Sequence, residues 1–166
     1  MQKEKNCYFS FCIKKFEEKT EIHSFQRERG KDMPFRKKPE LLAPAGSMES
    51  LKAAVQNGCD AVYLGGKLFS ARQYAGNFSL EELEEACNYC HLRGVKVYVT
   101  VNTVYKDKEL PEFIQFIGKL HRMGVDALIM QDAGAAKLVR EHYPDFPLHA
   151  STQMTVTGPE GMKFLE

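Results

Sequence analysis

Amide, hydroxyl and charged side chains follow the apolar segments of this chain where predicted strands end. In a barrel of parallel strands, these carboxyl ends and the loops after them carry the working groups. Carboxamides and hydroxyls bind polar groups, and an arginine fork suits a carboxylate or phosphate. The expected lining is Arg72, Asn77, Asn102, Gln131, Asp132, His149, Ser151 and Gln153. Helix capping is the alternative for Asp132, and also for Ser47, which follows the first strand.

Three of these residues alternate along one predicted strand, 148–154. His149, Ser151 and Gln153 share a face if the strand is regular, because side chains alternate with a period of two. On an inward face each polar group needs a partner or a ligand. We expect this trio to line the site, with His149 as the proton-transfer candidate; polar packing inside the barrel is the alternative.

The same trio makes a poor hydrolytic pair. Residues two apart on a strand lie about 7 Å apart, beyond hydrogen-bond reach of a nucleophile and its base. No His-Glu-x-x-His motif suggests a zinc protease. The residues themselves therefore offer no protease machinery.

The cysteines read as core residues rather than a redox or metal site. Their number is odd, five, without a secreted-type framework, which indicates a reducing, cytoplasmic compartment. Cys87-x-x-Cys90 falls near the end of a predicted helix, on its apolar face, whereas a redox pair usually begins a helix. Cys59 precedes a strand at the opposite end from the site. No metal ligand set is predicted.

A repeated unit must position the site residues. Gly58-Cys-Asp-Ala61 and Gly124-Val-Asp-Ala127 each begin an apolar strand, with a looser copy at Gly94 between them. The spacing of about 30 residues is typical of a strand with its crossover helix. The predicted strands are 41–43, 61–64, 95–101, 127–130 and 148–154, and the predicted helix starts are Ser47, Ser79, Asp107, Ala133 and Gly158-Pro159.

This α/β order fits either a parallel barrel or an open doubly wound sheet. No Gly-x-Gly-x-x-Gly follows the first strand, which argues against dinucleotide binding. Glycine-containing turns at 45–47 and 65–66 could admit an anion at a helix start, with plain turn geometry as the alternative. Five strands of the eight in a barrel leave raw edges, so we expect an incomplete barrel of low stability.

Charge separates a leader from the rest. Residues 1–38 hold 11 of the 23 Lys/Arg but only 6 of the 22 Asp/Glu. We expect a flexible basic leader over 1–38, with Met33 as an alternative start, and a barrel domain over 39–166. The domain shows no Lys/Arg cluster of the kind that grips nucleic acid, and no apolar run long enough to span a membrane.

These blocks together resemble the collagenase-like peptidases, the unassigned-type peptidase family thirty-two. The resemblance covers the chain from Glu40 onward and is carried by several segments in order. They are 40–47 (ELLAPAGS), 61–66 (AVYLGG), 69–72 (FSAR), 77–79 (NFS), 97–102 (VYVTVN), 131–132 (QD) and 149–154 (HASTQM).

The resemblance implies a TIM-type (β/α) barrel, present here as its N-terminal part. Branches of the family hydroxylate RNA: a tRNA wobble uridine, with prephenate as co-substrate, or a ribosomal RNA cytidine. Another branch serves quinone hydroxylation. Such members carry an iron–sulfur cluster on four cysteines that lie beyond this chain, and none of its five cysteines matches them.

We therefore expect the N-terminal portion of an RNA hydroxylation protein, inactive by itself and needing the remaining barrel half in cis or in trans. The expected partner is RNA or a small-molecule substrate, and no membrane. The alternatives are a peptidase, as the family name states, and a non-catalytic fragment or partner subunit.

Overall fold

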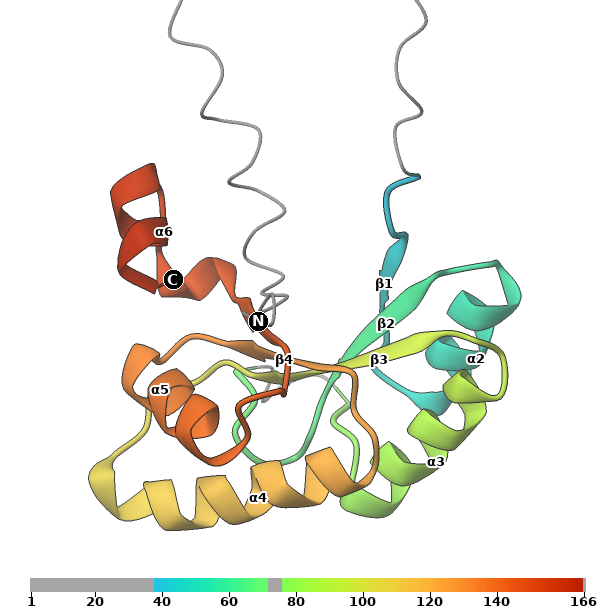
Figure 1. Ribbon diagram of the computed structural model, residues 1–166. Coiled ribbons are helices and arrows are strands. Elements are labelled where there is room, and N and C mark those ends of the chain that lie inside the picture. The colour runs from blue at the N-terminus through green and yellow to red at the C-terminus, as the bar shows by residue number, and fades with distance from the viewer. Residues whose placement is uncertain (1–37, 72–75, 166) are drawn as a thin grey trace, which may run out of the picture.

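The computed structural model describes residues 38–71 and 76–165. The predicted leader therefore lies outside the described residues except for Lys38. The described part is built of strands that alternate with helices (Figure 1). The strands are β1 (Leu42–Pro44), β2 (Ala61–Gly65), β3 (Lys96–Val101), β4 (Ala127–Met130) and β5 (Leu148–Ala150). The helices are α2 (Met48–Gln56), α3 (Leu80–His91), α4 (Leu110–Arg122), α5 (Ala133–His142) and α6 (Pro159–Leu165), with 3-10 turns η1 (Asp107–Glu109) and η2 (Thr152–Met154).

The five strands form one parallel sheet in the order β1-β2-β3-β4-β5, which is also their order in the sequence. Neighbouring pairs include Val62 with Val97, Val99 with Leu128 and Ile129 with His149. A doubly wound sheet reverses its strand order at a switch point, whereas a barrel adds each strand beside the last. The order therefore confirms the barrel-type alternative and shows five consecutive barrel units.

Alternate residues of each strand give the sheet two different faces. One face packs on the helices and forms the main core, which is closed by side chains such as Leu51, Leu83 and Phe113. This face contains the valines of β3 at 97, 99 and 101, all with no exposed area. Helices α3 and α4 lie below the sheet in Figure 1, and α6 stands above it, away from both.

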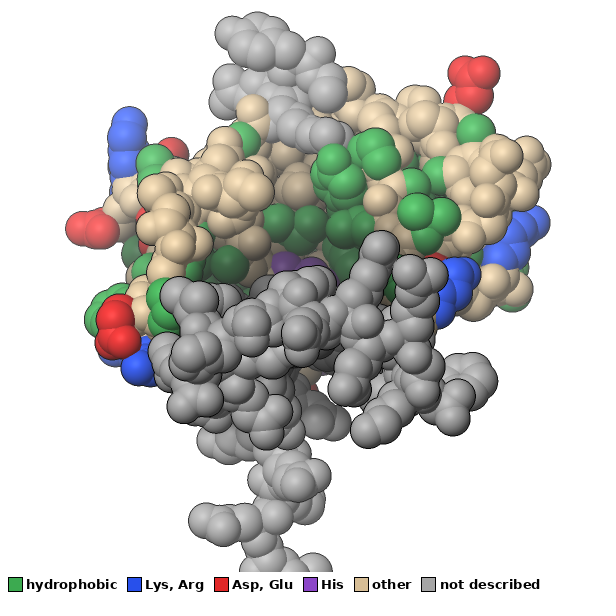
Figure 2. Space-filling model, turned by 90° about the horizontal axis from the view of Figure 1, so that it is seen from above, with side chains coloured by type: hydrophobic (Ala, Val, Ile, Leu, Met, Phe, Trp, Pro, Cys, Tyr) green, Lys and Arg blue, Asp and Glu red, His purple; other side chains and the backbone are tan. Residues whose placement is uncertain are grey.

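The other face corresponds to the interior of a barrel. A small cluster of Ala61, Tyr98 and Ala127, with Tyr63 and Ile129 against it, lies there. Figure 2 looks down on this side and shows hydrophobic side chains around a hollow in which a histidine is visible. The strand residues 61, 63, 96, 98, 127, 129 and 149 thus look inward, and the intervening ones look to the helices.

Side-chain caps begin three helices as expected, and a fourth differs. Ser47 and Ser79 each accept a hydrogen bond from the backbone three residues on, within a capping box, and Asp132 caps α5 through its contact with Ala135 N. Asp107 was expected to cap the third helix, which is wrong. It begins the 3-10 turn η1, and α4 starts at Leu110 with Pro111 in its first turn, a position that needs no N–H.

The last predicted strand is also shorter than expected. β5 ends at Ala150, and residues 152–154 form the 3-10 turn η2 instead of continuing the strand. Ser151 causes the change, because its hydroxyl accepts a hydrogen bond from Gln153 N, a local bond that competes with the sheet. Thr155 then closes the turn at φ 59°, in the left-handed region. His149, Ser151 and Gln153 therefore do not share one face of a strand.

Candidate functional site

Two separate groups of polar residues lie on the barrel side of the sheet. The first is a charged network on the inner face near the strand starts. Lys96 Nζ donates to Glu40 Oε2 over 2.7 Å, and Tyr98 Oη donates to Glu40 Oε1 over 2.6 Å. Partial burial acts to raise the pKa of Glu40, but the hydrogen bonds from Lys96 and Tyr98 outweigh it and leave the pKa below its ordinary value. Glu40 thereby ties the start of β1 to β3 across β2.

His149 belongs to this inner network rather than to the strand ends. Its ring packs edge-on against Tyr98, with centroids 4.8 Å apart and an interplanar angle of 81°. Burial lowers the pKa of His149, an effect that Glu40 opposes and Lys96 reinforces. The imidazole is therefore held in its neutral form, the form that can accept a proton.

The lowered pKa of His149 predicts a pH dependence of stability. As the pH falls below the ordinary histidine value of 6.5, the unfolded chain takes up this proton before the folded chain does. The free energy of unfolding should therefore decrease between pH 7 and the folded pKa. Urea unfolding of the wild type and of His149→Gln at pH 7.5 and 5.5 measures it.

The expected result is a steeper loss of stability in the wild type than in His149→Gln. The lowered pKa of Glu40 acts in a separate window, below about pH 4.5, so it does not confuse the comparison. Equal losses in the two proteins would contradict a depressed His149 pKa.

The second polar group lies at the carboxyl ends of β2 and β3. Ser70 Oγ is 3.0 Å from Thr100 Oγ1, and Thr100 Oγ1 donates to the Leu64 carbonyl over 3.2 Å. The loop after β2 is closed at its base, because Phe78 N donates to Gly65 O and Lys67 N to Phe78 O. Backbone hydrogen bonds thus hold the two ends of this loop together, and the Ser70 side chain contacts the end of β3.

Asn102 connects this loop to the segment after β5. Its Oδ1 accepts a hydrogen bond from Ala71 N over 3.2 Å, and its Nδ2 donates to Gln153 Oε1 over 2.9 Å. The structure therefore brings together two of the predicted site residues, Asn102 and Gln153. Tyr98, which holds His149, lies four residues earlier on β3, about 13 Å along the strand.

The other predicted residues have different placements. Asn77 approaches the end of β2, since a Cβ on Gly65 would lie 3.1 Å from Asn77 Oδ1. Gln131 is half-buried directly after β4, and Ser151 is the N-cap of η2. For Asp132 the capping alternative is confirmed, because its Oδ1 accepts a hydrogen bond from Ala135 N over 2.9 Å. Arg72 lies outside the described residues.

The α2 start is already occupied by its own side chains. Ser50 Oγ accepts from both Gly46 N and Ser47 N over 3.0 Å, and Ser47 Oγ accepts from Ser50 N. The amides that would hold an anion at this helix start are therefore satisfied internally. Plain turn and cap geometry, the alternative for segment 45–47, accounts for these residues.

Sequence reasoning missed the inner network and the Ser70–Thr100 pair. A signal was present in β3, where Lys96, Tyr98, Thr100 and then Asn102 alternate with buried valines. Polar side chains at a period of two in a strand with both faces covered mark the inward face. Along β3, Lys96 and Tyr98 belong to the inner network at the strand start, and Thr100 and Asn102 belong to the polar edge at its end.

The described cysteines do not fit an iron–sulfur cluster, which thiolates hold. Cys59, Cys87 and Cys90 are buried free thiols in the core, as expected. Burial raises the pKa of Cys87 to about 12 and that of Cys90 to about 11, which favours the thiol form. No group of three or more His, Cys, Asp or Glu side chains suited to a metal occurs within residues 38–71 and 76–165.

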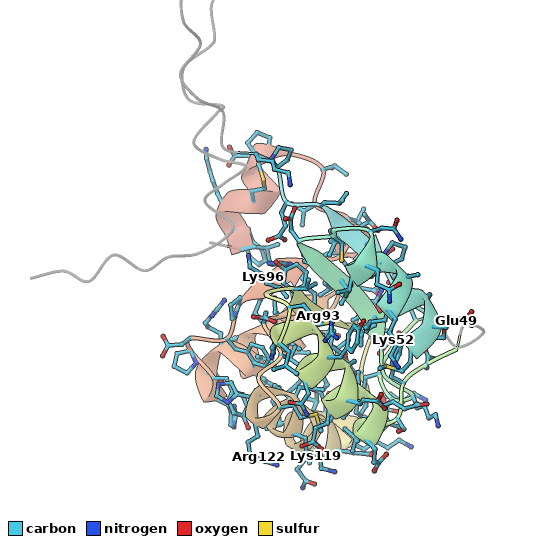
Figure 3. The ribbon with its side chains drawn as sticks, turned by 90° about the vertical axis from the view of Figure 1, so that its right-hand side faces the viewer. Glu49, Lys52, Arg93, Lys96, Lys119 and Arg122 are labelled. Carbon is cyan, nitrogen blue, oxygen red and sulfur yellow. The ribbon has the colours of Figure 1, made fainter. Side chains whose placement is uncertain are left out.

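The outer helical surface carries mixed charges. Figure 3 shows Lys52, Arg93, Lys119 and Arg122 spread over α2, α4 and the end of α3. Lys52 lies 3.9 Å from Glu85, and the Arg93 guanidinium stacks 3.7 Å from the Tyr89 ring. Lys52 and Arg93 therefore have local partners on this surface. In the part of the chain that the structure describes, no helix is long and apolar enough to cross a membrane.

The model of peptidase family U32 matches residues 46–166, most of the chain. The chain belongs to this family. This U32 chain is 41% identical over 127 residues to tRNA hydroxylation protein P of Escherichia coli (strain K12), which covers 76% of the chain and 28% of that protein. It is 43% identical over 126 residues to 23S rRNA 5-hydroxycytidine C2501 synthase of the same organism, covering 76% and 19%.

The U32 chain is also 35% identical over 126 residues to a protein named Collagenase from Porphyromonas gingivalis (strain ATCC BAA-308 / W83), covering 75% of the chain and 30% of that protein. It spans between 19% and 30% of the length of these three relatives. Among solved structures, the U32 peptidase Mk0906 superposes with a TM-score of 0.60 at 16% identity, covering 81% of this chain and 59% of the other. This likeness supports the partial (β/α) barrel fold.

Proposed function

We propose that this U32 chain is the N-terminal portion of a protein that hydroxylates a base in tRNA or rRNA. The observation that carries the proposal is the identity of 41% and 43% to two RNA hydroxylation proteins over three quarters of the chain. The polar edge at the ends of β2 and β3 suits this role, because carboxamides and hydroxyls read the polar edge of a base.

In this proposal the residues at the carboxyl edge of the sheet bind the substrate, and His149 transfers protons. Asn77, Asn102, Gln131, Asp132, Ser151 and Gln153 would line the pocket, and Arg72 would anchor an anionic group. His149 lies on the inner face of the sheet and is neutral because of burial, so it would be the group that accepts a proton there. The remaining barrel strands, in cis or in trans, would bring further side chains to the substrate-binding edge and to His149.

The cofactors would come from elsewhere in the complete protein. The iron–sulfur cluster that the family resemblance implies would sit on cysteines outside this chain, and prephenate would be a co-substrate in one branch. A cluster bound elsewhere would supply electron transfer. The residues described here would hold the substrate and exclude water around it.

A peptidase is the second candidate, favoured by the 35% identity to the relative named Collagenase. Such a peptidase requires a nucleophile and a base within hydrogen-bond reach of each other. Ser151 Oγ instead accepts from Gln153 N, and the His149 ring packs on Tyr98. A non-catalytic fragment or partner subunit is the third candidate.

Deletion of the natural gene tests the proposal. We expect a hydroxylated uridine or cytidine to disappear from total tRNA or rRNA, measured by nucleoside mass spectrometry. The natural gene on a plasmid should restore the hydroxylated nucleoside, and the Asn102→Ala gene should fail to restore it. The control variant Asn57→Ala, at the C-terminal end of α2, should restore it. Unchanged nucleosides would overturn the proposal, and collagen cleavage by the purified chain would favour the peptidase.

A further inference from the structure

The alanine of the repeated Gly-x-Asp-Ala unit lies on the inner face of the sheet in both copies. Ala61 is on β2 and Ala127 is on β4, and both are buried within the small inner cluster that contains Tyr98. Because the methyl group of alanine is short, side chains from the strands on either side can pass over it. The repeat therefore leaves two places where contacts can cross a strand on the inner face.

Ala61 lies between Glu40 and its two partners. In the register of the sheet it pairs with Leu42 of β1 and with Lys96 of β3. Glu40 stands two residues before Leu42, and its carboxylate reaches over β2 to Lys96 and Tyr98. A longer side chain at Ala61 would occupy the path of this carboxylate.

Ala127 has the same place between Tyr98 and His149. It pairs with Tyr98 of β3, whereas His149 of β5 pairs with Ile129, the next inward residue of β4. The two rings therefore meet diagonally across β4, with centroids 4.8 Å apart and an interplanar angle of 81°. Together the two crossings connect Glu40, Tyr98 and His149 in one series of contacts from the start of β1 to β5.

Both carboxylate oxygens of Glu40 are engaged in this series. Oε2 accepts from Lys96 Nζ over 2.7 Å, and Oε1 accepts from Tyr98 Oη over 2.6 Å. Burial lowers the pKa of His149, the negative charge of Glu40 opposes this effect, and Lys96 reinforces it. Tyr63, in the same inner cluster, is a further titratable group on this face. The state of His149 thus depends on how strongly the carboxylate is held by its other partners.

We propose that Lys96 and Tyr98 position the carboxylate of Glu40 so that the imidazole of the same network stays neutral. They are positioning residues, because they take both oxygens of the carboxylate and leave His149 able to accept a proton. The alanine of each repeat provides the space that these contacts need. The inference rests on the proposed function in one respect, since the proton transfer assigned to His149 belongs to that function.

Removal of one hydroxyl group tests the role of Tyr98. In Tyr98→Phe the ring can still pack on His149, but Glu40 Oε1 loses its donor. The carboxylate can then pair with the imidazole, so we expect the proton-binding constant of His149 to rise about tenfold, as an opposite charge at close range causes. Tyr89→Phe removes the same group on the outer helical surface and should leave the constant unchanged. An NMR titration of the histidine ring signals of the full chain measures the constant, and His149→Gln identifies the signal.

A double variant shows whether the effect passes through Glu40. Glu40→Gln alone should lower the proton-binding constant of His149, because it removes the negative charge that opposes burial. When Tyr98→Phe is added to Glu40→Gln, the constant should stay at the value of Glu40→Gln, since no carboxylate is left to release. A rise on Tyr98→Phe that is the same with and without Glu40, or no rise at all, would overturn the proposal.

Ala127→Val tests the space over the repeat. The added methyl groups should separate the two rings, so the nuclear Overhauser effect between Tyr98 and His149 should disappear. It should persist in the control Ala53→Val, at an exposed position of α2. If circular dichroism shows that Ala127→Val does not fold, Ala127→Cys, which adds a single heavy atom, takes its place. An unchanged Overhauser effect in the folded variant would contradict the role of the alanine.

These measurements are separate from the nucleoside measurement that tests the proposed function. If the titrations give the expected result while the deletion strain keeps its hydroxylated nucleosides, the positioning of Glu40 holds and the proposed function falls. If the nucleosides disappear but Tyr98→Phe leaves the proton-binding constant of His149 unchanged, the proposed function stands and the positioning is wrong.

Discussion

Phe113→Ala is expected to lower the free energy of unfolding by about 3–5 kcal/mol. Phe113 has no exposed area and lies at the centre of the helix-side core. Its ring packs on Tyr105, 4.4 Å between centroids, and edge-on against Phe69 at 5.6 Å. Truncation removes these contacts and leaves a cavity that the sheet above cannot fill. Most small domains are stable by about 5–15 kcal/mol, so the loss is a large share of the total.

The same substitution should loosen the loop after β2. Phe69 adopts φ 62°, in the left-handed region, where a bulky residue is strained and persists only if its surroundings hold it. The aromatic cluster provides that hold. Urea unfolding of the wild type, Phe113→Ala and the exposed control Gln115→Ala measures the effect. A change in Phe113→Ala no larger than in Gln115→Ala would contradict the packing argument.

Gly65→Ala is expected to cost about 1–3 kcal/mol and to disturb the polar edge. A Cβ at Gly65 would lie 2.5 Å from Ser70 Oγ, closer than real contacts allow, and 3.1 Å from Asn77 Oδ1, which is a tight contact. Ser70 would have to move away from Thr100, and the displacement would pass along the loop to Ala71, whose amide holds Asn102. Stability and site geometry should therefore change together.

The matched control for Gly65→Ala is Gly46→Ala. Gly46 is also a glycine beside a strand end, but a Cβ there meets no heavy atom within 4 Å. We expect its stability to stay within about 0.5 kcal/mol of the wild type. Thermal unfolding gives the stabilities, and the NMR shifts of the Ala71 amide and the Asn102 side-chain amide report the edge. Unshifted Ala71 and Asn102 signals in Gly65→Ala would rule out the coupling.

Local patterns predicted the fold well where the cause of structure is local. The capping boxes at Ser47 and Ser79 and the strand 127–130 follow from side chains next to one another in sequence, and the structure confirms them. The end of β5 was wrong, because a serine can bond the backbone two residues on, and apolar–polar alternation carries no sign of that competition. Apolar–polar alternation also did not show that Asp107 starts a 3-10 turn instead of capping α4.

The site was harder to predict, because it depends on which distant residues meet. Asn102 and Gln153 were both named, but their direct hydrogen bond joins positions 51 residues apart. His149 was expected at the strand ends, and its position against Tyr98 depends on the stagger between β3, β4 and β5. Glu40 was noticed only as part of a motif, since nothing local indicates that it reaches across β2 to Lys96 and Tyr98.

The strand order has a consequence for how the protein is made. In the described sheet each strand after β1 pairs with the one synthesised just before it, so strand pairing needs no distant segment. A chain leaving the ribosome N-terminus first can add β2 to β1, then β3 to β2, and bury each new helix at once. The Glu40 contacts with Lys96 and Tyr98 would form as soon as β3 emerges, and would then fasten the first three strands during translation.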